Sequence, residues 1–191
     1  MRRPCISVAA GLGMVAALLI PATTAGASGP PLYKSTVALA SVGNVPSVGA
    51  EAYSFNEFGN EIHLTGTKLG KVVVTMSSWG CQTGSWYAGN CGTIPGATFP
   101  ATITFNIYRG PYDPTTYVPG SLIASVTKPF NFPYRPSANY THCNGGNAGK
   151  WWDSSLHACL NGKAVSISFA FNVNLPTQDI IFGIAYNTTH Y

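Results

Sequence analysis

VSISFAFNV, residues 165–173, is the stretch of sequence that decides the fold. Apolar residues alternate along it with small or polar ones, and the apolar set is Val165, Ile167, Phe169, Phe171 and Val173. Successive side chains of a β-strand point to opposite faces, so this period of two predicts a strand with one face in a core and the other in water.

The same alternation occurs earlier in the chain, where Thr104 and Asn106 separate Ile103, Phe105 and Ile107. We expect these three apolar residues and the five of residues 165–173 to line one shared core, because a one-residue change of register would expose the whole set. Shorter apolar runs predict further strands at Ala50–Phe55, Glu61–Thr65, Val72–Trp79, Ser121–Thr127 and Asp179–Asn187, the last of them in a central position.

Turn-forming residues separate these segments, at Phe58-Gly59-Asn60, Leu69-Gly70, Pro95-Gly96, Pro119-Gly120 and Leu175-Pro176. No segment after Ala27 has the periodicity of a long amphipathic helix. About seven short antiparallel strands with such turns are typical of sandwiches and jelly rolls. The sequence therefore predicts an all-β fold, an antiparallel two-sheet sandwich that is jelly-roll or immunoglobulin-like and stabilised by disulfides.

The first residues of the chain have the organisation of a signal peptide. Arg2-Arg3 supplies positive charge, residues 8–20 are apolar, and Ala25-Gly26-Ala27 has the small-x-small form that signal peptidase cuts after. The apolar run is too short to span a bilayer comfortably. We therefore expect export, cleavage of residues 1–27, and a secreted, extracellular protein with no membrane span after cleavage.

The remaining chain is long enough for one domain. Residues 28–46 are rich in Pro, Gly and Ser, and we expect a linker or a loosely docked N-terminal segment there. Residues 47–191 are expected to form the sandwich domain. The chain stops at His190-Tyr191, directly after an apolar strand, which is compatible with a natural terminus or with a sandwich truncated at its C-terminus.

The composition narrows the classes of partner. Charged residues make up 8% of the chain, against about 25% in typical proteins. Removal of Arg2 and Arg3 leaves eight Lys/Arg against six Asp/Glu. This near balance predicts neither a nucleic-acid footprint nor a polybasic membrane-binding patch.

Four cysteines remain after cleavage: Cys81, Cys91, Cys143 and Cys159. An even number of cysteines in an exported chain predicts disulfides. Three pairings are open, and we favour Cys81–Cys91 with Cys143–Cys159 because each pair brackets a loop rich in Gly and Asn.

Three long insertions interrupt the predicted strands, at residues 80–100, 110–120 and 133–162, and functional surfaces of sandwiches usually lie on such loops. Two of them carry aromatic residues between the paired cysteines: Trp86, Tyr87, Trp151 and Trp152. Flat aromatic rings on clamped loops suit sugar binding by stacking. We predict that these four residues form any ligand surface that exists; the alternative is that the rings pack against the disulfides.

Other site chemistry has weaker support. His142 and His157 adjoin Cys143 and Cys159, a composition that zinc accepts, but in an oxidising compartment the disulfide is favoured over the metal. The acidic cluster that calcium prefers does not occur in the sequence. We therefore expect no metal and no cofactor.

Catalytic chemistry has little support either. Glycosidases need two facing carboxylates, whereas Glu57 and Glu61 flank the predicted Phe58-Gly59-Asn60 turn and are expected in solvent. The Gly-x-Ser-x-Gly elbow of many serine hydrolases does not occur in the sequence. We therefore expect no catalytic residues and no enzyme activity.

A set of short motifs is distinctive: Thr75–Cys81 with Trp86-Tyr87 and Asn90-Cys91, Asn106–Tyr108, Pro119–Ser125, Pro133–Ser137 and Ile184–Tyr191. Together they resemble a family of uncharacterised secreted proteins from high-GC Gram-positive bacteria, predicted to be β-sandwiches. The resemblance covers most of residues 44–191 and implies no known activity, catalytic residue or ligand. Similar proteins continue past the final Tyr with more strands, so the resemblance favours a sandwich truncated at its C-terminus.

From these observations we expect a secreted, non-catalytic extracellular module that binds a polysaccharide or another cell-envelope component. The first alternative is a structural or adhesion protein whose loops contact other proteins. A secreted hydrolase is the third.

Overall fold

The computed structural model of the protein describes residues 30–35, 55–116 and 118–186. Eight strands follow one another in this part of the chain: β1 Glu57–His63, β2 Lys68–Ser78, β3 Thr98–Arg109, β4 Leu122–Pro133, β5 Trp151–Asp153, β6 Ala158–Leu160, β7 Lys163–Asn174 and β8 Asp179–Tyr186. The one helical element of the same residues is the 3-10 turn η2, Gly145–Asn147. The predicted all-β class is confirmed.

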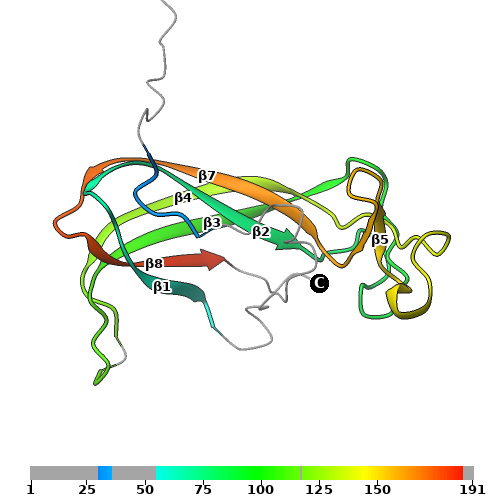
Figure 1. The fold of residues 1–191 in the computed structure, drawn as a ribbon, viewed down its shortest axis with the longest axis horizontal. Coiled ribbons are helices and arrows are strands. Elements are labelled where there is room, and N and C mark those ends of the chain that lie inside the picture. The colour runs from blue at the N-terminus through cyan, green and yellow to red at the C-terminus, as the bar shows by residue number, and fades with distance from the viewer. Residues whose placement is uncertain (1–29, 36–54, 117, 187–191) are drawn as a thin grey trace, which may run out of the picture.

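The strands form two layers and a small hairpin (Figure 1). One layer is a four-stranded antiparallel sheet in the order β1-β8-β3-β4, and the other is the antiparallel pair β2-β7. β5 and β6 make a separate hairpin at one end of the sandwich. The predicted central position of Asp179–Asn187 is confirmed for β8, which has β1 on one side and β3 on the other.

The core lies between the two layers. Ile103, Phe105 and Ile107 of β3 face it from the larger sheet. Ile167, Phe169 and Phe171 face it from β7, and the ring of Phe169 contacts those of Phe105 and Phe130. Val165 and Val173 are partly buried against the same cluster. All eight apolar residues that the alternation assigned to one core therefore belong to it.

Two of the predicted turns are wrong, since both lie inside strands. Phe58-Gly59-Asn60 belongs to β1, where Gly59 is the register partner of Gly183 in β8. A Cβ atom at Gly59 would lie 1.8 Å from the carbonyl oxygen of Phe182, so this glycine serves close approach of two strands. Leu69-Gly70 belongs to β2, at the register shift between Leu69 and Lys71, where a bulge accommodates the glycine.

The N-terminal predictions fall partly outside the described residues. Residues 1–27 lie outside them, as does the strand predicted at Ala50–Phe55 apart from Phe55, which is not in a strand. Of the predicted linker, residues 30–35 are described. Leu32 packs against the core, and its carbonyl oxygen accepts a hydrogen bond of 3.0 Å from the Thr65 amide. This short segment is therefore docked on the sandwich.

Candidate functional site

Two disulfide-bonded segments lie together at one end of the sandwich (Figure 1). The first loop, residues 79–97, connects β2 to β3 and contains the Cys81–Cys91 bond. The second loop, residues 134–162, connects β4 to β7 and contains the Cys143–Cys159 bond together with η2, β5 and β6. The predicted cysteine pairing is confirmed. We call the two loops together the clamped end.

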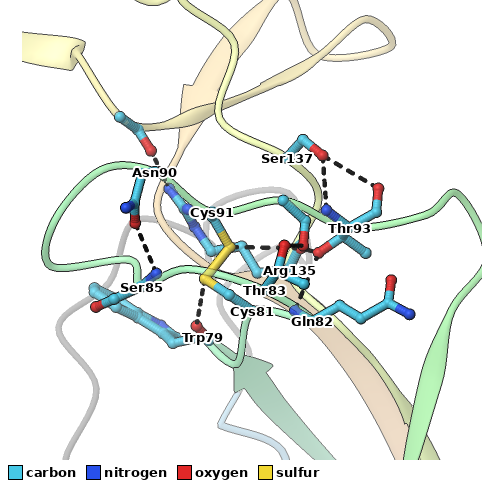
Figure 2. Close-up of a disulfide and its surroundings, with 12 residues drawn as sticks. Trp79, Cys81, Gln82, Thr83, Ser85, Asn90, Cys91, Thr93, Arg135 and Ser137 are labelled. Atoms are coloured by element: carbon cyan, nitrogen blue, oxygen red, sulfur yellow. Dashed lines mark hydrogen bonds between the residues drawn. A yellow bond between two sulfur atoms is a disulfide. The ribbon is translucent and has the colours of Figure 1, made fainter.

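The first loop is held by more than its disulfide (Figure 2). Thr83 and Gly92 exchange two backbone hydrogen bonds of 2.9 Å beside the Cys81–Cys91 bond. Farther out, the Asn90 side-chain oxygen accepts a hydrogen bond of 2.8 Å from the Ser85 amide. These contacts close the loop on itself on both sides of the aromatic residues, so the rings are presented by an ordered backbone.

Trp86 and Tyr87 are exposed, as predicted for ligand contact. Tyr87 has 86% of its surface exposed, the highest value among the large hydrophobic residues the structure describes, and Trp86 has 48%. The Trp86 ring is seated edge-on against Trp79, with ring centroids 4.7 Å apart. The Trp79 ring thus supports the Trp86 ring, a contact that the sequence does not predict. The planes of Trp86 and Tyr87 are nearly perpendicular, at 88°.

Trp151 corrects the predicted ligand surface. It is 5% exposed, and its indole Nε1 donates a hydrogen bond of 3.0 Å to the Gly162 carbonyl oxygen. The Lys163 ammonium lies 4.8 Å from its ring centroid. Trp151 therefore packs the base of the second loop and offers no free ring to a ligand. The reason lies in β5, where neighbouring residues point to opposite faces, so Trp151 and Trp152 cannot both point outward.

Trp152 is partly exposed and already has an aromatic partner. His142 stacks on it with ring centroids 4.8 Å apart and planes 14° from parallel. His157 approaches it at 6.2 Å in a nearly perpendicular orientation. The histidines considered for zinc are thus ring partners of Trp152. In residues 30–35, 55–116 and 118–186, no group of three or more His, Cys, Asp or Glu is placed to hold a metal.

Arg135, at the start of the second loop, connects the two loops, a role that its residue type and position in the sequence do not predict. Its backbone holds the first loop, because its amide donates to the Gly80 carbonyl oxygen at 2.8 Å and its carbonyl oxygen accepts from the Thr93 hydroxyl at 2.7 Å (Figure 2). Its guanidinium holds the second loop by donating to the carbonyl oxygens of Asn161 and Gly149, the latter at 2.6 Å.

The Arg135 side chain is buried, with only 2% of its surface exposed. Burial lowers its pKa from the ordinary value, because removal from water disfavours the charged form. A guanidinium still remains protonated in proteins. No carboxylate pairs with Arg135 among the described residues, where His63–Asp179 is the one ion pair. Its Nη1 atom has no hydrogen-bond partner there either. The clamped end is thus built around a buried, unpaired positive charge.

The two loops also touch directly. Gly89 of the first loop packs on Gly149 of the second, so closely that a Cβ atom on Gly149 would lie 2.7 Å from the Gly89 Cα. The Tyr140 hydroxyl donates a hydrogen bond of 2.8 Å to the Gly89 carbonyl oxygen, and Tyr140 is 58% exposed. Tyr140 is therefore a further exposed ring next to this junction. It precedes Cys143 and so lies outside the residues that the paired cysteines bracket.

Glu57 lies in a cluster of polar side chains on the larger sheet. The expectation that it is in solvent is therefore wrong. The carboxylate of Glu57 lies over Gly183 and accepts hydrogen bonds from the Tyr108 hydroxyl at 2.8 and 3.0 Å and from the Asn106 amide at 3.0 Å. Burial, and then the contact with Glu57, raise the pKa of Tyr108 above its ordinary value. These groups satisfy one another and tie β1 to β3 across β8.

Comparison of the chain with models of protein families, with curated proteins and with solved structures finds no match. In the part of the chain that the structure describes, no helix is long and apolar enough to cross a membrane.

Proposed function

We propose that this protein is a secreted, non-catalytic extracellular module that binds a polysaccharide or another cell-envelope component through the clamped end. The observation that carries the proposal is the pair of exposed rings, Trp86 and Tyr87, on a loop closed by a disulfide and by the Asn90 side chain. Ordered exposed rings favour binding because little conformational freedom is lost when the ligand arrives. Export is supported by the signal-peptide pattern of residues 1–27 and by the two disulfides.

The geometry of the rings favours one form of ligand. A flat crystalline polymer surface requires coplanar rings, whereas Trp86 and Tyr87 are nearly perpendicular. Perpendicular rings form a corner in which one sugar stacks on one face while a neighbouring sugar meets the edge of the other ring. We therefore expect binding to soluble polysaccharide chains, with Tyr87 as the principal stacking face.

The test is affinity electrophoresis, in which the mature protein migrates through native gels that contain soluble polysaccharides. Tyr87→Ala and Trp86→Ala should each reduce retardation, with affinities about three- to tenfold weaker, the range of a single aromatic contact. Tyr112→Ala is the matched control, since it removes a partly exposed ring at the opposite end of the sandwich. Unchanged retardation of both variants would refute the ring-based site. Trp151→Ala is unsuited to this test, because its ring is buried.

The alternative function, a structural or adhesion protein, has a specific observation in its favour. Ile94 is 68% exposed and Leu156 is 41% exposed, and both lie on the same two loops as the rings. Aliphatic side chains suit protein contact better than sugar stacking. Loss of partner binding in Ile94→Ser, with polysaccharide retardation absent in wild type, would favour this alternative. A hydrolase gains no support from Glu57, whose carboxylate contacts Tyr108 and Asn106.

A further inference from the structure

Charge is distributed unevenly along the long axis of the sandwich. The clamped end carries Arg135 and Lys150, and Lys163 begins β7 next to it, whereas its one carboxylate among the described residues is Asp153. The opposite end, where β1 and β3 end and β2 and β8 begin, carries the carboxylates of Glu61, Asp113 and Asp179 together with the cations Lys68 and Arg109 (Figure 1). The end with the exposed rings therefore has an excess of positive charge, and the opposite end does not.

The single carboxylate of the clamped end does not pair with Arg135 or Lys150. Asp153 Oδ1 accepts hydrogen bonds from the Ser155 amide, the Ser155 hydroxyl and the Leu156 amide at 2.6–3.2 Å, all within its own turn. The Lys150 ammonium donates to the side-chain oxygen of Asn147 at 2.9 Å, which is a neutral acceptor. Asp153 interacts electrostatically with Lys163, whereas Arg135 and Lys150 have no carboxylate partner among the described residues.

The buried charge lies directly beneath the junction of the two loops. Arg135 Nη2 donates to the carbonyl oxygen of Gly149, and Gly149 packs on Gly89 of the first loop. Lys150 follows Gly149 in the chain, and its ammonium contacts the side chain of Asn147, two residues before Gly149. A desolvated charge is screened less than one in water, so its field acts on groups that bind at the adjacent surface.

We propose that the ligand of the clamped end is an acidic polysaccharide. Its carboxylate or phosphate groups lie over the Gly89–Gly149 junction, close to Arg135 and Lys150, while a neighbouring sugar stacks on Tyr87 or Trp86. This inference rests on the proposed function and adds the charge of the polymer. It also gives a role to the Arg135 guanidinium, because its Nη1 atom is buried without a hydrogen-bond partner among the described residues.

The test compares polymers that differ only in charge. Polygalacturonate is paired with its methyl-esterified, neutral form, and phosphorylated dextran with dextran, in the affinity gels described above. We expect stronger retardation by the acidic member of each pair, and weaker retardation when NaCl is raised from about 0.05 M to about 0.5 M, because salt shortens the range of charge interactions. The polymer pair with the larger difference in retardation shows whether the protein prefers carboxylate or phosphate groups.

Two variants locate the effect. Lys150→Gln should weaken binding of the acidic polymer roughly two- to fivefold, the range of an exposed charge pair, and leave binding of the neutral polymer unchanged. Lys68→Gln is the matched control, since it removes an exposed lysine at the start of β2, away from the clamped end. Equal sensitivity of both variants would overturn the assignment to the clamped end. Circular dichroism melting of each variant shows that the fold is retained.

The remaining outcomes separate the inference from the proposed function. Equal retardation by acidic and neutral polymers would overturn the acidic ligand and retain the polysaccharide site. No retardation by any of the four polymers would overturn both. Binding to vesicles that contain anionic lipid, without binding to acidic polysaccharide, would also overturn the inference and assign the clamped end to a membrane surface.

Discussion

The sandwich body and the clamped end reach order through different interactions. The body buries one cluster of eleven apolar residues between its two sheets, and none of them belongs to the two disulfide-bonded loops. The clamped end instead relies on two disulfides, on hydrogen bonds to backbone carbonyls, and on Arg135, which contacts both loops. Burial of alternating residues specifies a sheet, whereas covalent and polar contacts let loops outside the main apolar cluster keep a fixed shape.

The largest expected effect tests whether the body depends on its apolar cluster. Phe169 is fully buried between the sheets and contacts Phe105 and Phe130. Phe169→Ala should lower the free energy of unfolding by about 3–5 kcal/mol, from lost burial and the cavity left behind. Urea denaturation measures the change. Val73→Ala, at an exposed position of β2, is the control and should change stability by less than about 0.5 kcal/mol. A Phe169→Ala protein as stable as wild type would contradict the assigned core.

The next effect tests whether the clamped end depends on covalent closure. Removal of the second-loop disulfide by Cys143→Ala with Cys159→Ala should cost about 3 kcal/mol, as expected for a loop of 16 residues. The first-loop disulfide closes 10 residues and should contribute slightly less. Hydrogen exchange should show lost protection in residues 134–162 and retained protection in β3 and β7. Loss of protection throughout the body would show that the two regions are not separable.

A smaller effect tests the contact between the two loops. Gly149 has φ +81°, and an added Cβ would lie 2.7 Å from Gly89, whereas Gly145 has φ +54° with open space around it. Both alanine variants introduce left-handed strain of about 1–2 kcal/mol. Gly149→Ala should lose about 1–3 kcal/mol more, because the loops must separate. Thermal melting of the pair isolates that difference, and equal melting temperatures would show that the junction contributes nothing.

The smallest effects concern the pH dependence of stability. The sandwich body should lose a contribution to its stability at high pH, and the clamped end should lose one at low pH. Burial and Glu57 raise the folded-state pKa of Tyr108 above 10.0, so its contribution is present below about pH 10 and is lost as the pH rises through the raised value. Hydrogen bonds from Ser155 lower the folded-state pKa of Asp153 below 3.8, so its contribution is present above that value and is lost as the pH falls through the lowered one.

Two variants measure these contributions. Tyr108→Phe should cost about 1 kcal/mol at neutral pH, the usual size of a lost hydrogen bond, and the difference from wild type should shrink in alkali. The difference between Asp153→Asn and wild type should shrink in acid. Urea denaturation across the pH range gives both differences. Differences that do not vary with pH would show that neither group couples its protonation to folding.

The two regions also differed in what the sequence could predict. The period of two along residues 165–173 identified the core of the body because burial on one face leaves a regular signal. Cysteine spacing and loop composition predicted the disulfides. The Gly59 turn was wrong because a glycine marks both turns and close strand contacts, and only its register partner Gly183 distinguishes them.

The interior of the clamped end was not predictable in the same way. Arg135 binds backbone carbonyl oxygens of residues distant in the sequence. Because every residue has a backbone carbonyl, such a contact requires no particular residue type and cannot be recognised in the sequence. The three-residue strand β5 is too short to leave an alternating pattern in the sequence, so the sequence alone does not distinguish Trp151 from Trp152. Within a strand, adjacent aromatic residues point to opposite faces, and that rule separates the buried ring from the partly exposed one.

The placement of the disulfides bears on how this protein can diversify. Each bond joins two cysteines of the same loop, so no disulfide links the two loops to each other or to the two sheets of the sandwich. Arg135 contacts the backbone carbonyls of Gly149 and Asn161, and these contacts restrict the path of the second loop. Residues such as Trp86, Tyr87 and Leu156 lie between these fixed points. Substitutions there can change the shape and chemistry of this surface while the register of the strands is retained.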